Sequence, residues 1–195
     1  MLAARLGVMY GVYLRRPEES DGREFVEAAK GSVSMHRPWV YPTVTVKGFA
    51  EYLDRIQDSR HEGYLVCRKS DDRMAGIVNL SEITHGALQC AFVGYWGVQG
   101  YCGGGRMTRG LALVFDEAFI GLGLHRLEVN IQPGNERSVR LVERLGLSKE
   151  GFSPRYLKIG GEWRDHERWA LTSEDWSGAE SVLARLSASH SSPSK

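Results

Sequence analysis

Three consecutive glycines stand directly before an amphipathic stretch, and their type and spacing suggest chemistry more directly than any other residues do. Gly103, Gly104 and Gly105 precede apolar residues that recur at helical spacing over 107–118. A helix that begins after glycines presents bare backbone N–H groups at its first turn, and the helix dipole adds positive potential there. The stretch predicts a phosphate site, although glycines can also simply form a strand-to-helix turn.

The residues around these glycines exclude the two commonest phosphate motifs. A Walker loop requires a lysine after its last glycine, and Arg106 and Met107 stand there instead. A dinucleotide fingerprint requires a glycine where Thr108 stands, and it follows the first strand of a parallel unit rather than lying in mid-chain. We therefore expect neither a mononucleotide site nor a dinucleotide site.

Composition limits the class of protein and its partners. A chain of 195 residues is long enough for one domain with a full core. The net charge of +1 gives no general attraction to nucleic acid or to an anionic membrane, and no run reaches transmembrane length. Three cysteines and six histidines show no metal-ligand spacing, so no metal is expected. The odd cysteine count and the absence of a signal-peptide pattern at the N-terminus predict a cytoplasmic protein.

Hydrophobic periodicity predicts one strand, two helices, three antiparallel strands, a helix, a strand, a helix and two strands, which is an α+β layout. The expected strands are 12–15, 63–68, 75–82, 87–96, 126–131, 149–159 and 164–171. Helices are expected after Asp21, from Val46, over 107–118, between Asn135 and Gly146, and weakly after Ser173. Residues 12–176 are expected to form the domain, with 177–195 as a C-terminal extension whose end is disordered.

A series of short motifs, in this order and at this spacing, resembles one protein family. They are GYW at 94–96, MTRGL at 107–111, LGLHRLE at 122–128, NxxS at 135–138, ERLG at 143–146, EGF at 150–152 and WRDH at 163–166. The chain resembles the Gcn5-related N-acetyltransferases (GNAT), and among them the RimJ/RimL-type protein acetyltransferases. The resemblance covers about Tyr13 to Trp176. It implies a mixed, mostly antiparallel sheet of about seven strands flanked by about four helices.

The resemblance also implies a ligand for the glycine turn, namely the pyrophosphate of acetyl-CoA. The usual pattern is Arg/Gln-x-x-Gly-x-Gly/Ala, so Cys102 and Met107 depart from it while the central Gly105 is kept. Backbone amides survive such substitutions, and they can still bind phosphate. The cofactor-binding residues implied are Tyr95, Trp96, Cys102, Gly103, Gly104, Gly105, Arg106, Met107, Thr108, Asn130, Asn135 and Ser138. Asn135 can equally be the N-cap of the helix that follows it.

Acetyl transfer to an amine needs an acid for the departing sulfur and a base for the amine. Many relatives use a tyrosine as the acid, and Val142 stands at that position here. The resemblance implies that Ser138 assists the sulfur instead, although a serine in a first helical turn can also merely solvate that turn. As base we expect Glu82, at the end of a central strand, with Glu128 as second candidate; most glutamates at strand ends are simply solvated.

The segment 34–42 combines two prolines with aromatic residues, so His36, Trp39 and Tyr41 are candidates for acceptor binding, with burial against the core as the alternative. The resemblance implies transfer of an acetyl group from acetyl-CoA to a primary amine at a protein N-terminus, with ribosomal proteins among the acceptors to test. Two alternatives remain: an acetyltransferase for a small amine such as an amino acid, polyamine or antibiotic, and a non-catalytic acyl-CoA-binding module. The sequence does not indicate an oligomeric state.

Overall fold

Seven strands form one sheet in the computed structural model, which describes residues 11–190. The strands are β1 (Val12–Arg15), β2 (His61–Arg68), β3 (Met74–Thr84), β4 (Cys90–Gly97), β5 (Arg126–Ile131), β6 (Ser148–Ile159) and β7 (Glu162–Thr172). Their order across the sheet is β1-β2-β3-β4-β5-β7-β6, and only β4 and β5 are parallel neighbours. The α+β expectation and the sheet of seven strands are confirmed.

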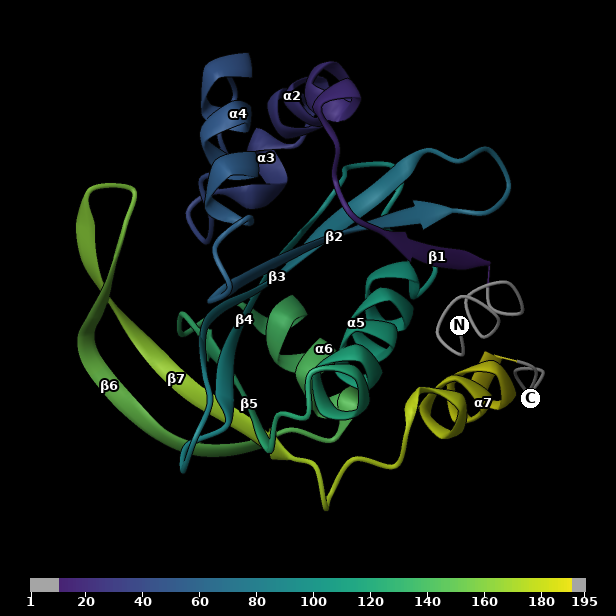
Figure 1. Cartoon of the computed structure of the whole chain (residues 1–195), viewed down its shortest axis with the longest axis vertical. Coiled ribbons are helices and arrows are strands. Elements are labelled where there is room, and N and C mark those ends of the chain that lie inside the picture. Colours follow the sequence, from purple (N-terminus) through teal and green to yellow (C-terminus); the bar gives the residue numbers. More distant parts are fainter. Residues whose placement is uncertain (1–10, 191–195) are drawn as a thin grey trace.

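Helices cover both faces of the sheet (Figure 1). On one face lie α2 (Gly22–Gly31), α3 (Val33–His36) and α4 (Val46–Arg55). On the other lie α5 (Arg106–Asp116), α6 (Glu136–Leu145) and α7 (Ala179–His190). A 3-10 turn at Glu19–Asp21 leads into α2, and a π-helical turn at Glu117–Gly121 extends α5.

Alternating side chains on the central strands divide the core into two layers. Val78 pairs with Tyr95, and both contact the layer under α5 and α6. Their neighbours Ile77 and Trp96 also pair, and they face the layer under α2 and α4. Because successive residues of a strand point to opposite faces, the GYW motif on β4 presents Tyr95 and Trp96 to opposite sides of the sheet.

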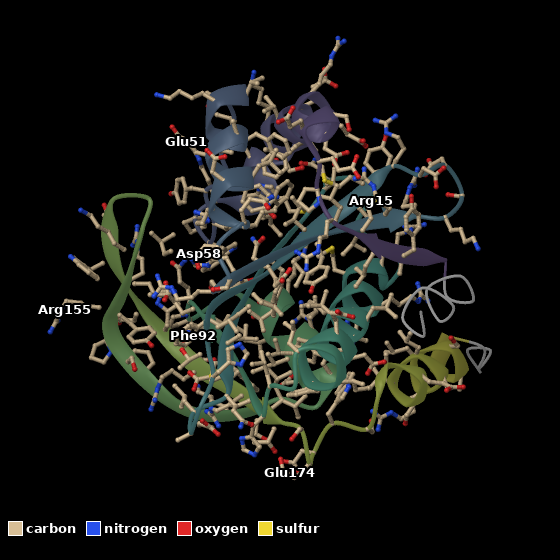
Figure 2. The ribbon with its side chains drawn as sticks, in the orientation of Figure 1. Arg15, Glu51, Asp58, Phe92, Arg155 and Glu174 are labelled. Carbon is tan, nitrogen blue, oxygen red and sulfur yellow. The ribbon has the colours of Figure 1, made fainter. Side chains whose placement is uncertain are left out.

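The sheet opens between β4 and β5. Three residue pairs join these strands, and the last is Phe92 with Glu128. Within residues 11–190 no further pair joins them, although β4 continues to Gly97 along β3 and β5 continues to Ile131 along β7. Figure 2 labels Phe92 at the point where this separation begins. The middle of the sheet therefore contains a gap bordered by two unpaired strand edges.

Two predicted segments differ from the structure in detail, and a third prediction is not tested. The proline-containing segment 34–42 begins within α3 and becomes a loop only after His36. The final helix starts at Ala179 rather than directly after Ser173, and its Val182 and Leu183 are buried against the core under α5. The last part of the extension, for which disorder is expected, lies outside the described residues after His190.

Candidate active site

A cleft of about 980 Å³ lies where β4 and β5 separate. Its walls come from α3 and the loop after it, the ends of β4 and β5, the glycine turn, α6, and the arm formed by β6 and β7. Figure 1 shows this arm curving away from the sheet toward the side of α4. Of the residues predicted from the sequence, Tyr95, Trp96, Asn130 and Ser138 meet at this one cleft.

The glycine turn forms the N-terminal end of α5 as expected. Gly104 and Gly105 have φ angles of 64° and 76°, a left-handed conformation that favours glycine, and Gly105 is the N-cap of α5. Among the hydrogen bonds of the described residues, none pairs the backbone N–H groups of Met107 and Thr108 within the protein. Unpaired amides at a helix N-terminus are the donors that an anion requires.

Two arginines hold the opposite side of the same turn. Arg106 donates to the carbonyl of Gly103 at 2.8 Å, and Arg109 donates to the carbonyl of Gly104 at 2.7 Å. Gly103 and Gly105 border the cleft, whereas Gly104 and Arg106 do not. The arginines therefore occupy the carbonyl oxygens of the turn, and its N–H groups remain available.

The residues that depart from the family pattern brace this turn. A Cβ atom on Gly97 would lie 2.6 Å from the Cβ of Cys102, so the cysteine packs tightly against the end of β4. Met107 packs in the same way against Gly76 on β3, where a Cβ would lie 2.3 Å from its sulfur. Cys102 and Met107 thus fix the turn against the sheet mainly through packing.

A short hydrogen bond joins the two walls of the cleft. The hydroxyls of Tyr95 on β4 and Ser138 on α6 are 2.5 Å apart. Burial raises the pKa of Tyr95 to about 12, with the bond to Ser138 acting in the opposite direction. The phenol therefore stays protonated at neutral pH and can supply a proton to Ser138. Asn135 caps α6, because its side chain accepts from the N–H of Ser138 at 3.3 Å.

Two further features of the lining suit a long, amide-containing, phosphorylated ligand. The Oδ1 atom of Asn130 is buried without a partner among the described residues, on the open edge of β5. Three arginines of α6, Arg137, Arg140 and Arg144, border the cleft. These arginines were missed in the sequence, where their spacing of three and four residues along one predicted helix was the available signal.

The three residues predicted for acceptor binding lie in different surroundings. His36 is 4% exposed, its Nε2 lies 2.8 Å from the carbonyl oxygen of Gly97, and burial lowers its pKa. Trp39 borders the cleft, and its carbonyl accepts from Gln132 at 3.0 Å. Tyr41 does not border the cleft: it lies beneath the guanidinium of Arg37, 5.3 Å from ring centre to Cζ, and against the turn of the β6–β7 arm.

The structure does not bring Glu82 into the cleft. Its carboxylate is exposed and pairs with Arg60 at 3.2 Å. The register of β3 against β4 shifts between Ser81 and Thr84, and Glu82 has a φ of 51°, so the strand alternation on which the prediction depended fails here. Glu128 does not border the cleft either, and it pairs with Arg126 at 2.8 Å.

The charged side chains that line the cleft are all positive over the described residues. Over the described residues, its lining includes four arginines and no aspartate or glutamate. Residues 11–190 also contain no group of three or more potential metal ligands, and none of their helices is both long enough and apolar enough to cross a bilayer. The cleft thus suits anionic and neutral groups better than a multiply charged cation.

Comparison with known proteins gives the same picture. A family profile described as an acetyltransferase (GNAT) domain matches residues 12–148. The chain is 38% identical over 159 residues to the probable N-acetyltransferase YjcK of Bacillus subtilis, covering 80% of this chain and 86% of that protein. In Escherichia coli it is 36% identical over 106 residues to the ribosomal protein uS5-alanine N-acetyltransferase, covering 54% and 55%. It is also 28% identical over 160 residues to the spermidine N(1)-acetyltransferase, covering 80% and 83%.

Among solved structures, Mycobacterium smegmatis RimJ in complex with CoA-disulfide superposes with a TM-score of 0.83. It is 27% identical, and the match covers 90% of this chain and 89% of that one. The fold of this chain is thus the fold of a solved RimJ protein that was observed with a form of CoA bound. The chain belongs to the GNAT family and is an acetyl-CoA-dependent N-acetyltransferase.

Proposed function

We propose that the acceptor is the N-terminal α-amine of a protein or peptide. The observation that carries this proposal is the cleft lining, which holds four arginines and no carboxylate over the described residues. A polyamine carries several positive charges, and these would be repelled by arginines and left unpaired without acidic partners. A peptide N-terminus carries one ionisable amine followed by neutral amides, which such a lining accepts.

Each part of the cleft has a role in this reaction. The free N–H groups of Met107 and Thr108 would bind the cosubstrate pyrophosphate, and the arginines of α6 would add positive potential along its path. Asn130 Oδ1, which is buried and unpartnered, would accept from an amide of the pantetheine arm. The open edge of β4 beyond Phe92 would offer a backbone N–H to the thioester oxygen as it becomes negative.

Ser138 and Tyr95 would serve the departing sulfur. As the C–S bond breaks, the sulfur takes a proton from the Ser138 hydroxyl, which is replaced by the proton of Tyr95 at 2.5 Å. The tyrosine thus enters from β4, not from α6, where many relatives carry theirs and this chain has Val142. A proton donor at the sulfur favours an enzyme over a non-catalytic acyl-CoA-binding module.

The names of the relatives support acetylation of more than one kind of amine. One relative is named for the alanine of ribosomal protein uS5, and another is named for spermidine. The higher identity to the ribosomal enzyme extends over about half of the chain, whereas the lower identity to the spermidine enzyme extends over most of it. The lining of the cleft supports the peptide over spermidine.

The experiment measures release of the free thiol of CoA with matched acceptors. One peptide carries a free α-amine and no lysine, its twin has the same sequence with a formylated N-terminus, and the third acceptor is spermidine. We expect turnover with the free peptide alone. Turnover with spermidine alone, or with none of the three acceptors despite CoA binding, would overturn the peptide assignment.

A further inference from the structure

Two histidines border the cleft, and they differ in which ring nitrogen is available. His36 directs Nε2 to the carbonyl oxygen of Gly97 at 2.8 Å, and its Nδ1 is sealed from solvent without a partner. His166 does the reverse. Its Nδ1 lies 3.0 Å from the carbonyl oxygen of Arg164, and its Nε2 has no protein partner among the described residues and is not sealed. His166 is 2% exposed overall, and of the two cleft histidines in the described residues it alone has a ring nitrogen that is neither hydrogen-bonded nor fully sealed.

The carbonyl of Arg164 determines the tautomer of this histidine. A carbonyl oxygen can only accept, so Nδ1 must carry the hydrogen, and the neutral ring then has its lone pair on Nε2. The ring of Tyr156 on β6 contacts the imidazole edge-on, with ring centres 6.2 Å apart, and limits its rotation. The His166 side chain is thus held in one orientation with an acceptor nitrogen at the cleft.

Strand register places His166 beside the ligand path. Asn130 pairs with Arg168 on β7, so His166, two residues earlier, is the diagonal neighbour of Asn130 on the same face. Diagonal neighbours lie about 7–8 Å apart. This face also carries Trp96 and His36, opposite to the face of Tyr95 and Ser138. The acceptor amine and the leaving sulfur would thus be served from opposite sides of the sheet.

The surroundings keep His166 neutral. Burial lowers its pKa, and the hydrogen bond to Arg164 and the nearby Asp165 act weakly in the opposite direction. The Asp165 carboxylate is itself bound to the N–H of Arg155 at 2.7 Å. The other ionisable groups near this part of the cleft are Arg168 on β7, Tyr156 on β6, and Arg37 and His36 from α3 and its loop. Over the described residues, the cleft lining holds no carboxylate that could compete as the base.

We propose that His166 is the general base of acetyl transfer, a role that rests on the proposed function for the identity of its amine. The neutral α-amine attacks the thioester carbon and forms the C–N bond. The nitrogen proton of the resulting intermediate passes to Nε2 of His166. The C–S electron pair leaves with sulfur, which takes the Ser138 proton. The imidazolium then releases its proton to solvent and the Tyr95–Ser138 pair regains one from solvent, so the products formed from the neutral amine are the acetamide and the free thiol of CoA.

An N-terminal amine suits a base of this strength. Its ordinary pKa is about 8, compared with about 10.4 for lysine, so a useful fraction is already neutral near pH 7. A histidine with a lowered pKa cannot deprotonate a lysine ammonium efficiently, but it can accept a proton from the far more acidic intermediate formed after attack. The base and the proposed acceptor are therefore matched in acidity.

The test replaces His166 with asparagine, whose side-chain N–H can keep the bond to the Arg164 carbonyl while the Nε2 acceptor is lost. We expect kcat/KM for the peptide to fall about 10²-fold with KM for acetyl-CoA unchanged. In the wild type, kcat/KM also falls as the pH drops below the His166 pKa, and this limb should vanish in the variant. Imidazole added to His166→Ala should restore part of the lost turnover. The matched control is His125→Asn, because His125 is exposed and pairs with Glu174 outside the cleft.

The outcomes separate this inference from the proposed function. If the wild type acetylates spermidine rather than peptides, the acceptor assignment fails and His166→Asn is measured with spermidine. Wild-type kcat/KM and an unchanged acid limb in His166→Asn, with either acceptor, would overturn the inference. Imidazole nitrogen chemical shifts give a readout without turnover: we expect the Nδ1–H tautomer at pH 7, and an Nε2–H tautomer would equally overturn it.

Discussion

The hydroxyls of Tyr95 and Ser138 lie 2.5 Å apart and bridge β4 to the first turn of α6 across the opening in the sheet. The two residues are far apart in sequence, because α5 and β5 lie between β4 and α6. The pair exists only because β4 and β5 separate after Phe92 and admit the side chains of α6. The hydrogen bond that would carry the proton to the sulfur therefore depends on the separation of β4 from β5.

Ser138→Ala should lower kcat about 10²-fold, because the departing sulfur loses its proton donor. KM for acetyl-CoA should change little, since Asn135 still caps α6. Tyr95→Phe should have a similar effect, and the double variant should lose little more than either single change. Steady-state kinetics checks this, with Ser148→Ala at the exposed start of β6 as control. Unchanged turnover in Ser138→Ala would remove the role.

Gly105→Ala should weaken CoA binding about tenfold, because an alanine at a φ of 76° forces the turn to shift and misdirects its free N–H groups. The control is Gly86→Ala, which places the same strain, at a φ of 73°, in the turn between β3 and β4. Calorimetric titration with CoA checks both. Equal loss of affinity in the two variants would indicate a general loss of stability and not a local phosphate site.

Arg137→Gln and Arg144→Gln should each weaken CoA binding several-fold, because they remove positive charge from the wall of the cleft. The difference from wild type should shrink as salt is raised from low to physiological concentration, since exposed charges are screened. Arg155→Gln is the matched control, because Arg155 projects outward from the β6–β7 arm (Figure 2). A salt-independent effect would argue for lost packing of α6.

Asp21→Asn should destabilise the fold by about 2 kcal/mol, because it breaks hydrogen bonds with the Arg15 guanidinium, at 2.7 Å and 2.5 Å, and with the N–H of Glu18. Burial alone would raise the pKa of Asp21, but these bonds lower it below its ordinary value. The stabilisation is therefore complete above about pH 4 and is lost as the pH falls through the lowered value.

Thermal unfolding between pH 3 and pH 7 checks this expectation. The wild type should lose more stability than Asp21→Asn over the acid part of the range, so that the two melting curves converge. Glu27→Gln is the control, because Glu27 forms an exposed helical pair with Arg23 that contributes about 0.5 kcal/mol or less. Parallel pH profiles for wild type and Asp21→Asn would contradict the assignment.

Most of the elements could be predicted from the sequence because local pattern and tertiary packing agree in them. β5 coincides with the predicted strand, and Asn135 and Gly146 delimit α6 as expected. The glycine turn was predictable for the same reason, since a left-handed N-cap at Gly105 is a requirement of backbone geometry. Cosubstrate and family followed from motif order, and they are confirmed.

The site residues that depend on register could not be predicted in this way. A shift in the register of β3 against β4 near Ser81 directs Glu82 to Arg60, and the sequence contains no pattern that predicts this shift. His166 stood in a motif that supported the family resemblance but carried no role. Its open nitrogen becomes apparent only when the Arg164 carbonyl is seen to fix the ring.

The unpaired edges of β4 and β5 have a thermodynamic consequence. Beyond Phe92 and Glu128 no backbone hydrogen bonds join β4 to β5 in the described part of the chain, so backbone groups on both strand edges remain unpaired in the middle of the sheet. A ligand arm that carries amides can complete the missing ladder and tie the halves together. Because the cosubstrate binds the folded sheet and not the unfolded chain, it stabilises the fold by an amount that grows with its concentration relative to its dissociation constant. In this enzyme the cosubstrate is therefore a stabilising part of the folded sheet as well as the source of the acetyl group.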